Sequence, residues 1–257
     1  MNKKAVVSLI VIFTVIALIV ITSLLFMVNS ITVEATSDLH LTASEEAEIV
    51  EDSKIVLHSN MFSLAENIAI SYIELSHPYI KVISIERKFP SKVCINVSKR
   101  TPVLAMPLTD GTYALLDREL KVLELVPEVE YPYVTIISGT SISTPQLGAF
   151  CDDRLGWLSN IVTEAEGLSF VNARFATLIP SITFEEASEG NLGKIYLQIN
   201  TGVTFVLENN TLALGDYFNY AYTKYMKLND LEKSSGYIIV QNNPDKQEMD
   251  VIYSENL

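Results

Sequence analysis

Few side chains in this sequence have a type and spacing that suit catalysis or metal binding. The cysteines, Cys94 and Cys151, lie far apart, and the histidines, His40, His58 and His77, are scattered. Neither set has the close spacing of a zinc site, and no histidine is near either cysteine in the sequence. In an oxidising compartment the two cysteines could form one disulfide, so the sequence leaves their pairing open.

Two pairs of adjacent carboxylates are the remaining candidates for acid–base chemistry. Glu45 and Glu46, like Glu185 and Glu186, lie in polar runs, where side chains are usually solvated. The sequence has no glycine-rich phosphate loop and no G-x-S-x-G, H-E-x-x-H or S-x-x-K motif. We therefore predict no catalytic, cofactor-binding or metal-binding residues, and favour a non-enzymatic binding protein. A membrane-tethered enzyme of cell-wall metabolism that uses an unrecognised carboxylate is the alternative.

The strongest pattern is an uncharged apolar run over residues 5–28. These 24 residues include no Gly or Pro, and 17 of them are Val, Ile, Leu or Phe. As a helix they would be about 36 Å long, enough to cross the roughly 30 Å hydrocarbon layer of a membrane. Lys3 and Lys4 precede the run and acidic residues follow it, which predicts a cytoplasmic tail at residues 1–4 and an extracytoplasmic remainder. A cleaved signal peptide is the alternative, although its apolar core usually has about 7–15 residues.

The segment after this run is acidic. It contains 31 Asp and Glu against 16 Lys and Arg, a formal charge of −15. Nucleic acid and anionic lipid attract the opposite sign of charge, so the composition predicts neither as a partner. No motif predicts a small-molecule substrate.

Residues 31–101 have the pattern of a small α/β domain. Thr42 with Glu45, and Ser63 with Glu66, have the spacing of a capping box and predict the starts of two helices. Three runs alternate between apolar and polar residues and predict strands: 31–35, 81–87 and 92–98. Three strands need helices on one face to be stable, so we predict the order βααββ.

Residues 102–257 have the pattern of a larger domain of short strands with flanking helices. Helical spacing covers residues 154–166 and the segment from Asp216 to Leu228. The predicted strands are 103–106, 113–116, 122–125, 133–137, 173–183, 194–199, 203–207, 237–240 and 250–253. The last two flank the turn-prone residues 242–245 and predict a closing hairpin. The fold class is therefore α+β: one N-terminal transmembrane helix, a small βααββ domain, and a larger, mostly antiparallel β domain.

Two stretches after the apolar run have a more specific pattern. Residues 77–102 are similar to the end of the POTRA domain in the FtsQ/DivIB family of bacterial cell-division proteins, and residues 113–117 resemble the strand and Asp that open that family's β domain. Glu119 departs from the family, which often has Gly at this place. The resemblance implies a POTRA domain at residues 31–101 and an FtsQ/DivIB-type β domain at residues 102–257.

The family's role implies a non-enzymatic divisome scaffold that links early and late cell-division proteins. In this family the C-terminal strands pair with a strand from an FtsB/DivIC-type protein, which travels with an FtsL-type protein. The corresponding partner-binding residues here are Tyr237, Ile238, Ile239, Val240, Gln241, Val251, Ile252 and Tyr253. Tyr253 is the expected aromatic anchor of this interface. A frayed, exposed terminus is the alternative interpretation of that residue.

The resemblance also implies a location. We expect a single-pass protein of the bacterial cell membrane at the division septum, with a cytoplasmic N-terminus. A POTRA-bearing export or sensing component is a further alternative, and that class is expected to have a translocating barrel or a long C-terminal extension. The sequence leaves open which sheet edge is free and whether the protein self-associates.

Overall fold

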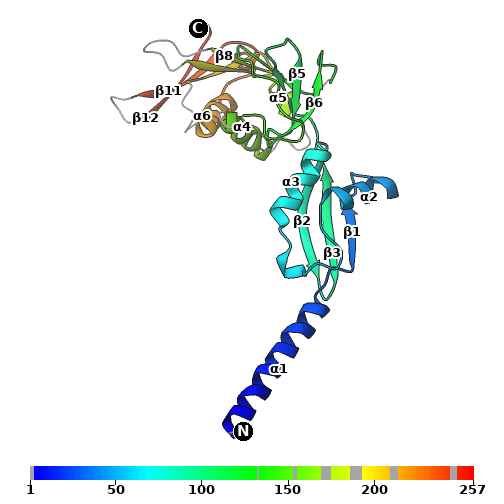
Figure 1. Cartoon of the computed structure of the whole chain (residues 1–257). Helices are drawn as coiled ribbons and strands as arrows, with labels where there is room; N and C mark the ends of the chain where they lie inside the picture. Colours follow the sequence, from blue (N-terminus) through cyan, green and yellow to red (C-terminus); the bar gives the residue numbers. More distant parts are fainter. Residues whose placement is uncertain are drawn as a thin grey trace. The chain divides into compact units, whose positions relative to one another are not determined.

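The structure is a computed structural model in which the chain forms two compact units, residues 1–100 and 101–257 (Figure 1). The structure describes residues 3–131, 133–152, 155–168, 175–185, 193–208, 214–243 and 248–257. Several residues of predicted elements lie outside this set: 1–2 of the tail, 154 of a helix, 173–174 of a strand, and 244–245 of the closing turn. Each unit is described by itself below.

The first unit contains the predicted βααββ order after a long helix. Its elements are α1 (Lys3–Leu25), β1 (Ser30–Ala35), α2 (Ala43–Asp52), the 3-10 turn η1 (Met61–Ser63), α3 (Glu66–Ser76), β2 (Ile80–Lys88) and β3 (Lys92–Lys99). The sheet has the order β1-β3-β2, with β1 parallel and β2 antiparallel to β3. Helix α2 contacts β1 and α3 contacts β2, so apolar residues of both helices and the sheet form one core.

The apolar run at the N-terminus divides between helix α1 and the first folded core. Helix α1 ends at Leu25, before the end of the predicted span, and Val28 is fully buried in the core of this unit. In the part of the chain that the structure describes, no helix is both long and apolar enough to cross a membrane. The predicted transmembrane span therefore has no support from the structure.

One of the two predicted capping boxes is present. The Glu45 N–H donates to Thr42 Oγ1 at 3.3 Å, and the Thr42 N–H donates to Glu45 Oε2 at 2.7 Å, so the pair caps α2. The second prediction is wrong, because the N-cap of α3 is Ala65 and no side chain caps this helix. The Ser63 hydroxyl donates to the Asn60 carbonyl oxygen at 2.7 Å. Asn60 Oδ1 accepts the Phe62 N–H at 2.8 Å and caps η1 instead.

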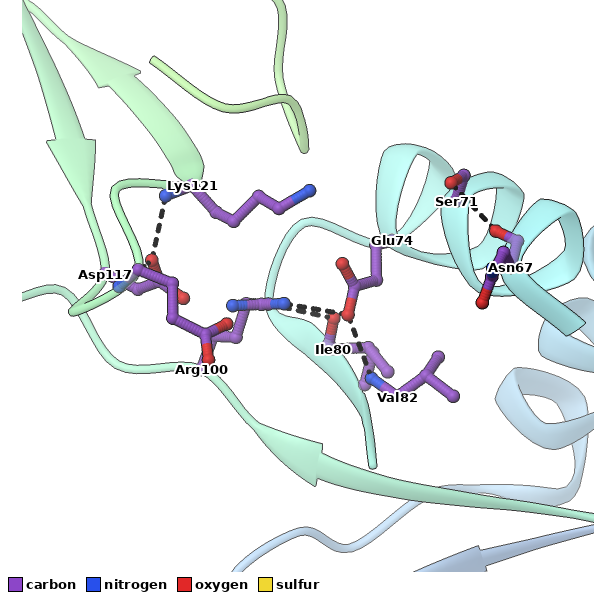
Figure 2. A network of polar contacts seen from close by, with 9 residues as sticks. Asn67, Ser71, Glu74, Ile80, Val82, Arg100, Asp117 and Lys121 are labelled. Carbon is purple, nitrogen blue, oxygen red and sulfur yellow. Dashed lines mark hydrogen bonds and ion pairs between the residues drawn. The ribbon is translucent and has the colours of Figure 1, made fainter. Parts of the chain in front are cut away.

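A buried ion pair lies at the C-terminal end of the first unit. Figure 2 shows the Arg100 guanidinium pointing toward the Glu74 carboxylate on α3, and the Nη2–Oε1 distance is 2.8 Å. The Arg100 Nε–H also donates to the Ile80 carbonyl oxygen at 3.3 Å, and the Val82 N–H donates to Glu74 Oε1 at 3.2 Å. These bonds connect the end of β3 to α3 and to the start of β2.

The second unit is built on one nine-stranded sheet. Its strands are β4 (Leu104–Pro107), β5 (Tyr113–Leu116), β6 (Val122–Val126), β7 (Thr135–Ser138), β8 (Ser181–Glu185), β9 (Lys194–Gln198), β10 (Thr204–Glu208), β11 (Tyr237–Asn243) and β12 (Glu248–Ser254). The order is β12-β11-β10-β9-β8-β7-β4-β5-β6. Neighbouring strands are antiparallel except in the pairs β10–β11, β7–β8 and β4–β7.

Helices cover one face of this sheet. They are α4 (Gly156–Gly167), the short α5 (Phe175–Leu178) and α6 (Leu214–Met226), and the 3-10 turn η3 (Glu232–Ser234) precedes β11. Helix α6 contacts α4, β10, β11 and β12, and the two helices lie side by side in Figure 1. The aromatic face predicted for the last helix packs in this core, where Phe218 lies beside Phe205. The strand predicted over 173–183 is too long, since 175–178 are helical.

Asp117 forms the turn between β5 and β6. Its buried Oδ1 accepts the Glu119 N–H at 2.9 Å and the Lys121 N–H at 2.8 Å, and Figure 2 draws the second bond. The left-handed residue of this turn is Leu120, with φ of 61°. Because the positive φ falls at Leu120, Glu119 fits at the place where the family often has Gly.

Candidate partner-binding edge

The predicted partner-binding residues lie on the hairpin β11–β12. Seven residue pairs join its strands, from Tyr237↔Ser254 to Asn243↔Glu248. Residues Tyr237–Val240 of β11 also pair with β10, so their backbone groups face a strand on both sides. In the described part of the sheet no strand pairs with the outer side of β12. On this hairpin, a strand added beside Tyr237–Val240 must therefore pair with β12, while these β11 residues offer only side chains.

The hairpin residues alternate between two faces. Ile238 and Val240 on β11 are fully buried on the helix-covered face, and Val251 and Tyr253 on β12 pack against the same core. Ile252 belongs to the other face, is 47% exposed and lies directly opposite Ile239. The eight predicted residues thus form one hairpin, but only some can meet a partner.

Tyr253 is held by the start of β11. Its hydroxyl donates to the Ser235 carbonyl oxygen at 3.1 Å. Its ring lies against Gly236, where an added Cβ would come within 2.9 Å of the ring and φ is 98°. Partial desolvation raises the pKa of Tyr253, and the negative charges of Glu255 and Glu232 raise it further. Tyr253 therefore fixes the hairpin from the helix side, and its role as the aromatic anchor of a partner interface stays a prediction.

An apolar row lies next to β12 on the face of the sheet opposite the described helices. The strand register places Ile252, Ile239, Val206 and Tyr196 side by side on β12, β11, β10 and β9. Val206 is buried within the row. Burial raises the pKa of Tyr196 to about 12, with a further contribution from its hydrogen bond to Glu185. The sequence did not indicate Val206 and Tyr196, because only the strand order brings them beside Ile239.

The opposite edge of the sheet is partly covered. Strand β6 begins at Val122, whose N–H donates to the Ala149 carbonyl oxygen at 3.0 Å. The Val122 carbonyl oxygen accepts the Gly148 N–H at 2.8 Å. Backbone groups at the start of β6 are therefore already used, which leaves β12 as the better candidate for strand addition.

The side chains first considered for catalysis have other surroundings. Both cysteines are free thiols; burial raises the pKa of Cys94, and it raises that of Cys151 to about 12, so both are protonated and weakly nucleophilic at neutral pH. Glu45 caps a helix and Glu185 accepts a tyrosine hydroxyl, while Glu186 lies outside the described residues. Among the residues that the structure describes, no group of three or more His, Cys, Asp or Glu is placed to hold a metal ion.

Residues 29–100 match the family model of the POTRA domain, FtsQ-type. The matched segment contains every strand and helix of the first unit after α1 and ends at Arg100, where that unit ends. No curated protein matches the chain.

Proposed function

We propose that this chain, a member of the FtsQ/DivIB family of cell-division proteins by its FtsQ-type POTRA domain, is a scaffold of the bacterial divisome. The domain type supports a role in cell division, and the family is non-enzymatic. The scaffold would link early and late division proteins at the septum. Its partners in this proposal are an FtsB/DivIC-type protein and the FtsL-type protein that travels with it.

The outer side of β12 is the observation that carries the partner-binding proposal. A terminal strand presents a row of backbone donors and acceptors that an extended peptide can pair with. The exposed Ile252 and its neighbour Ile239 add apolar contacts beside this edge. Backbone pairing supplies affinity and these side chains supply selectivity.

Replacing Ile252 with Asp tests this edge. Ile252 is half exposed and lies away from the helix-covered core, so the change removes apolar contact without opening that core. We expect weaker capture of the FtsB/DivIC-type partner by the full chain, with a loss of about 1–2 kcal/mol typical of an interface contact. Ile83→Asp is the matched control, because Ile83 is 53% exposed on β2 of the other unit. Equal capture of the partner by both variants would refute the proposal that the partner binds at the β12 edge.

The membrane anchor is part of the same proposal. It rests on the uncharged apolar sequence of residues 5–28 and on Lys3 and Lys4, which precede that run. The side chains described in α1 cover residues 7–22, about 24 Å at 1.5 Å per residue, and the apolar sequence continues on both sides. Membranes washed at alkaline pH should retain the full chain, and release into the wash would contradict the anchor.

The cellular role has its own test. Depletion of the protein should give filamentous or unseptated cells, and a fluorescent tag at the N-terminus should form a band at midcell. Normal septation after depletion would contradict the divisome assignment, whatever the outcome of the partner measurements.

A further inference from the structure

Three phenylalanines from separate segments meet at one end of the first unit. Phe26 follows α1, Phe62 lies in η1, and Phe89 lies in the turn between β2 and β3. The ring centroids are 5.3 Å apart for Phe26–Phe62, 5.5 Å for Phe26–Phe89 and 5.8 Å for Phe62–Phe89. Each ring therefore contacts the other two, and we refer to these residues as the Phe26–Phe62–Phe89 cluster.

This cluster is not a buried core. Phe62 is 62% exposed and Phe89 is 57% exposed. A second aromatic cluster, which includes Phe205 and Phe218, is fully buried at both of those residues. Aromatic rings that contact one another while their outer faces stay uncovered are typical of a binding surface.

Backbone bonds fix the cluster to the end of α1. The Met61 N–H donates to the Phe26 carbonyl oxygen at 2.9 Å, and the His58 N–H donates to the Val28 carbonyl oxygen at 2.7 Å. The Val28 N–H donates in turn to the Ser59 carbonyl oxygen at 3.0 Å. Backbone hydrogen bonds thus join the segment that carries Phe62 directly to the residues that follow α1.

The uncovered apolar surface is continuous with that of α1. Side chains along the helix, such as Phe13 and Leu18, are exposed, and so is Leu25 at its end. Phe26 is the next residue and belongs to the cluster. Because the two apolar surfaces are continuous, the environment that covers the end of α1 also covers Phe62 and Phe89.

We propose that the Phe26–Phe62–Phe89 cluster inserts into the interfacial layer of the lipid bilayer. This inference rests on the proposed membrane anchor, which places the end of α1 at the bilayer surface. Apolar side chains that lie in the plane of the interface gain by burying their surface about 5–10 Å into the headgroup and acyl boundary. The POTRA domain is then held against the membrane at η1 and at the β2–β3 turn as well as through α1.

Tryptophan substitution in the full chain measures this contact. The variant Phe62→Trp is reconstituted in vesicles of phosphatidylcholine and phosphatidylglycerol, with part of the lipid carrying a quencher near the headgroup. The control is Ile83→Trp, because Ile83 is also exposed and lies about 20 Å from Phe89 along β2 at roughly 3.3 Å per residue. The native chain has a single tryptophan, Trp157, in the second unit, and its emission is the background to subtract.

Vesicle flotation tests the membrane anchor, and quenching tests the insertion of the Phe26–Phe62–Phe89 cluster. If the chain floats, we expect blue-shifted emission from Trp at position 62 and a marked loss of it with the quencher, while Trp at position 83 keeps its emission. Flotation with no quenching at position 62, or with equal quenching at both positions, would overturn the inference and leave the anchor intact. A chain that does not float overturns both. Phe89→Trp repeats the measurement if circular dichroism shows that Phe62→Trp is misfolded.

Discussion

The ion pair between Arg100 and Glu74 is buried at the end of the first unit. Replacing Glu74 with Ala leaves the buried guanidinium without this carboxylate, and such losses cost about 3–5 kcal/mol. We expect that decrease in the free energy of unfolding, measured by urea denaturation with far-UV circular dichroism.

Glu66 provides the matched control for Glu74, because it lies on the same helix. Its ion pair with Arg87 is partly exposed, so Glu66→Ala should cost only about 0–1 kcal/mol. Similar losses for the two variants would show that the burial of the Arg100 pair contributes little.

Asp117 stabilises the turn between β5 and β6 in the second unit. Replacing it with Ala removes the acceptor of two backbone N–H groups in a buried turn, and hydrogen bonds to a charged group are worth about 1.5–3 kcal/mol each. Trp157 fluorescence during urea denaturation reports on this unit. Asp117→Asn keeps an acceptor oxygen and should lose less free energy of unfolding than Asp117→Ala. An equal loss would show that the accepted hydrogen bonds do not stabilise the turn.

Local motifs were predictable from the sequence only where no neighbour competed. Thr42 and Glu45 form the predicted capping box, with both of its reciprocal hydrogen bonds present. The Ser63 motif has the same spacing, but Asn60 caps the preceding 3-10 turn and its carbonyl oxygen accepts the Ser63 hydroxyl. A four-residue pattern cannot reveal a competing acceptor just before it.

The closing hairpin was predictable from alternation, but its neighbours were not. Strand alternation in Tyr237–Asn243 indicates one buried face, which the structure shows at Ile238 and Val240. The parallel pairing of β11 with β10 depends on the crossover through α6, and no local signal encodes it. For this reason the sequence could place the candidate residues together but could not identify β12 as the terminal strand.

Gly236 tests how far the hairpin depends on close packing. A Cβ at this position would lie 2.8 Å from the Ser254 carbonyl oxygen and 2.9 Å from the Tyr253 ring. Gly236→Ala should displace β12, lower the free energy of unfolding by about 1–3 kcal/mol, and weaken capture of the partner. Denaturation and pull-down with the full chain measure both effects.

Gly111→Ala separates packing from backbone strain. Gly111 also has a positive φ, 87°, but an added Cβ there would have no neighbour within 4 Å. Its substitution should lower the free energy of unfolding by about 1 kcal/mol, through backbone strain alone, and should leave partner capture unchanged. If both variants lose the same amount, contact with Tyr253 and Ser254 is not what requires a glycine at position 236.

At the scale of the whole molecule, predictability differs between the two units. The first unit has short connections and a specific sequence ending at residues 77–102, and the FtsQ-type POTRA match covers residues 29–100. The second unit has many short strands whose pairing joins distant segments, such as β4 with β7. Periodicity finds those strands, but their order depends on contacts that no short window of sequence contains.

The parallel pair β1–β3 gives the first unit a mechanical property. Six residue pairs join these strands, from Ser30↔Lys92 to Ala35↔Val97. Strand β1 follows α1, and β3 leads out of the unit at Arg100. A pull applied at the start of β1 and at Arg100 therefore draws the start of β1 and the end of β3 in opposite directions along their length. The hydrogen bonds of this ladder then bear the load together in shear, so the three-stranded sheet resists extension of the first unit between these two points.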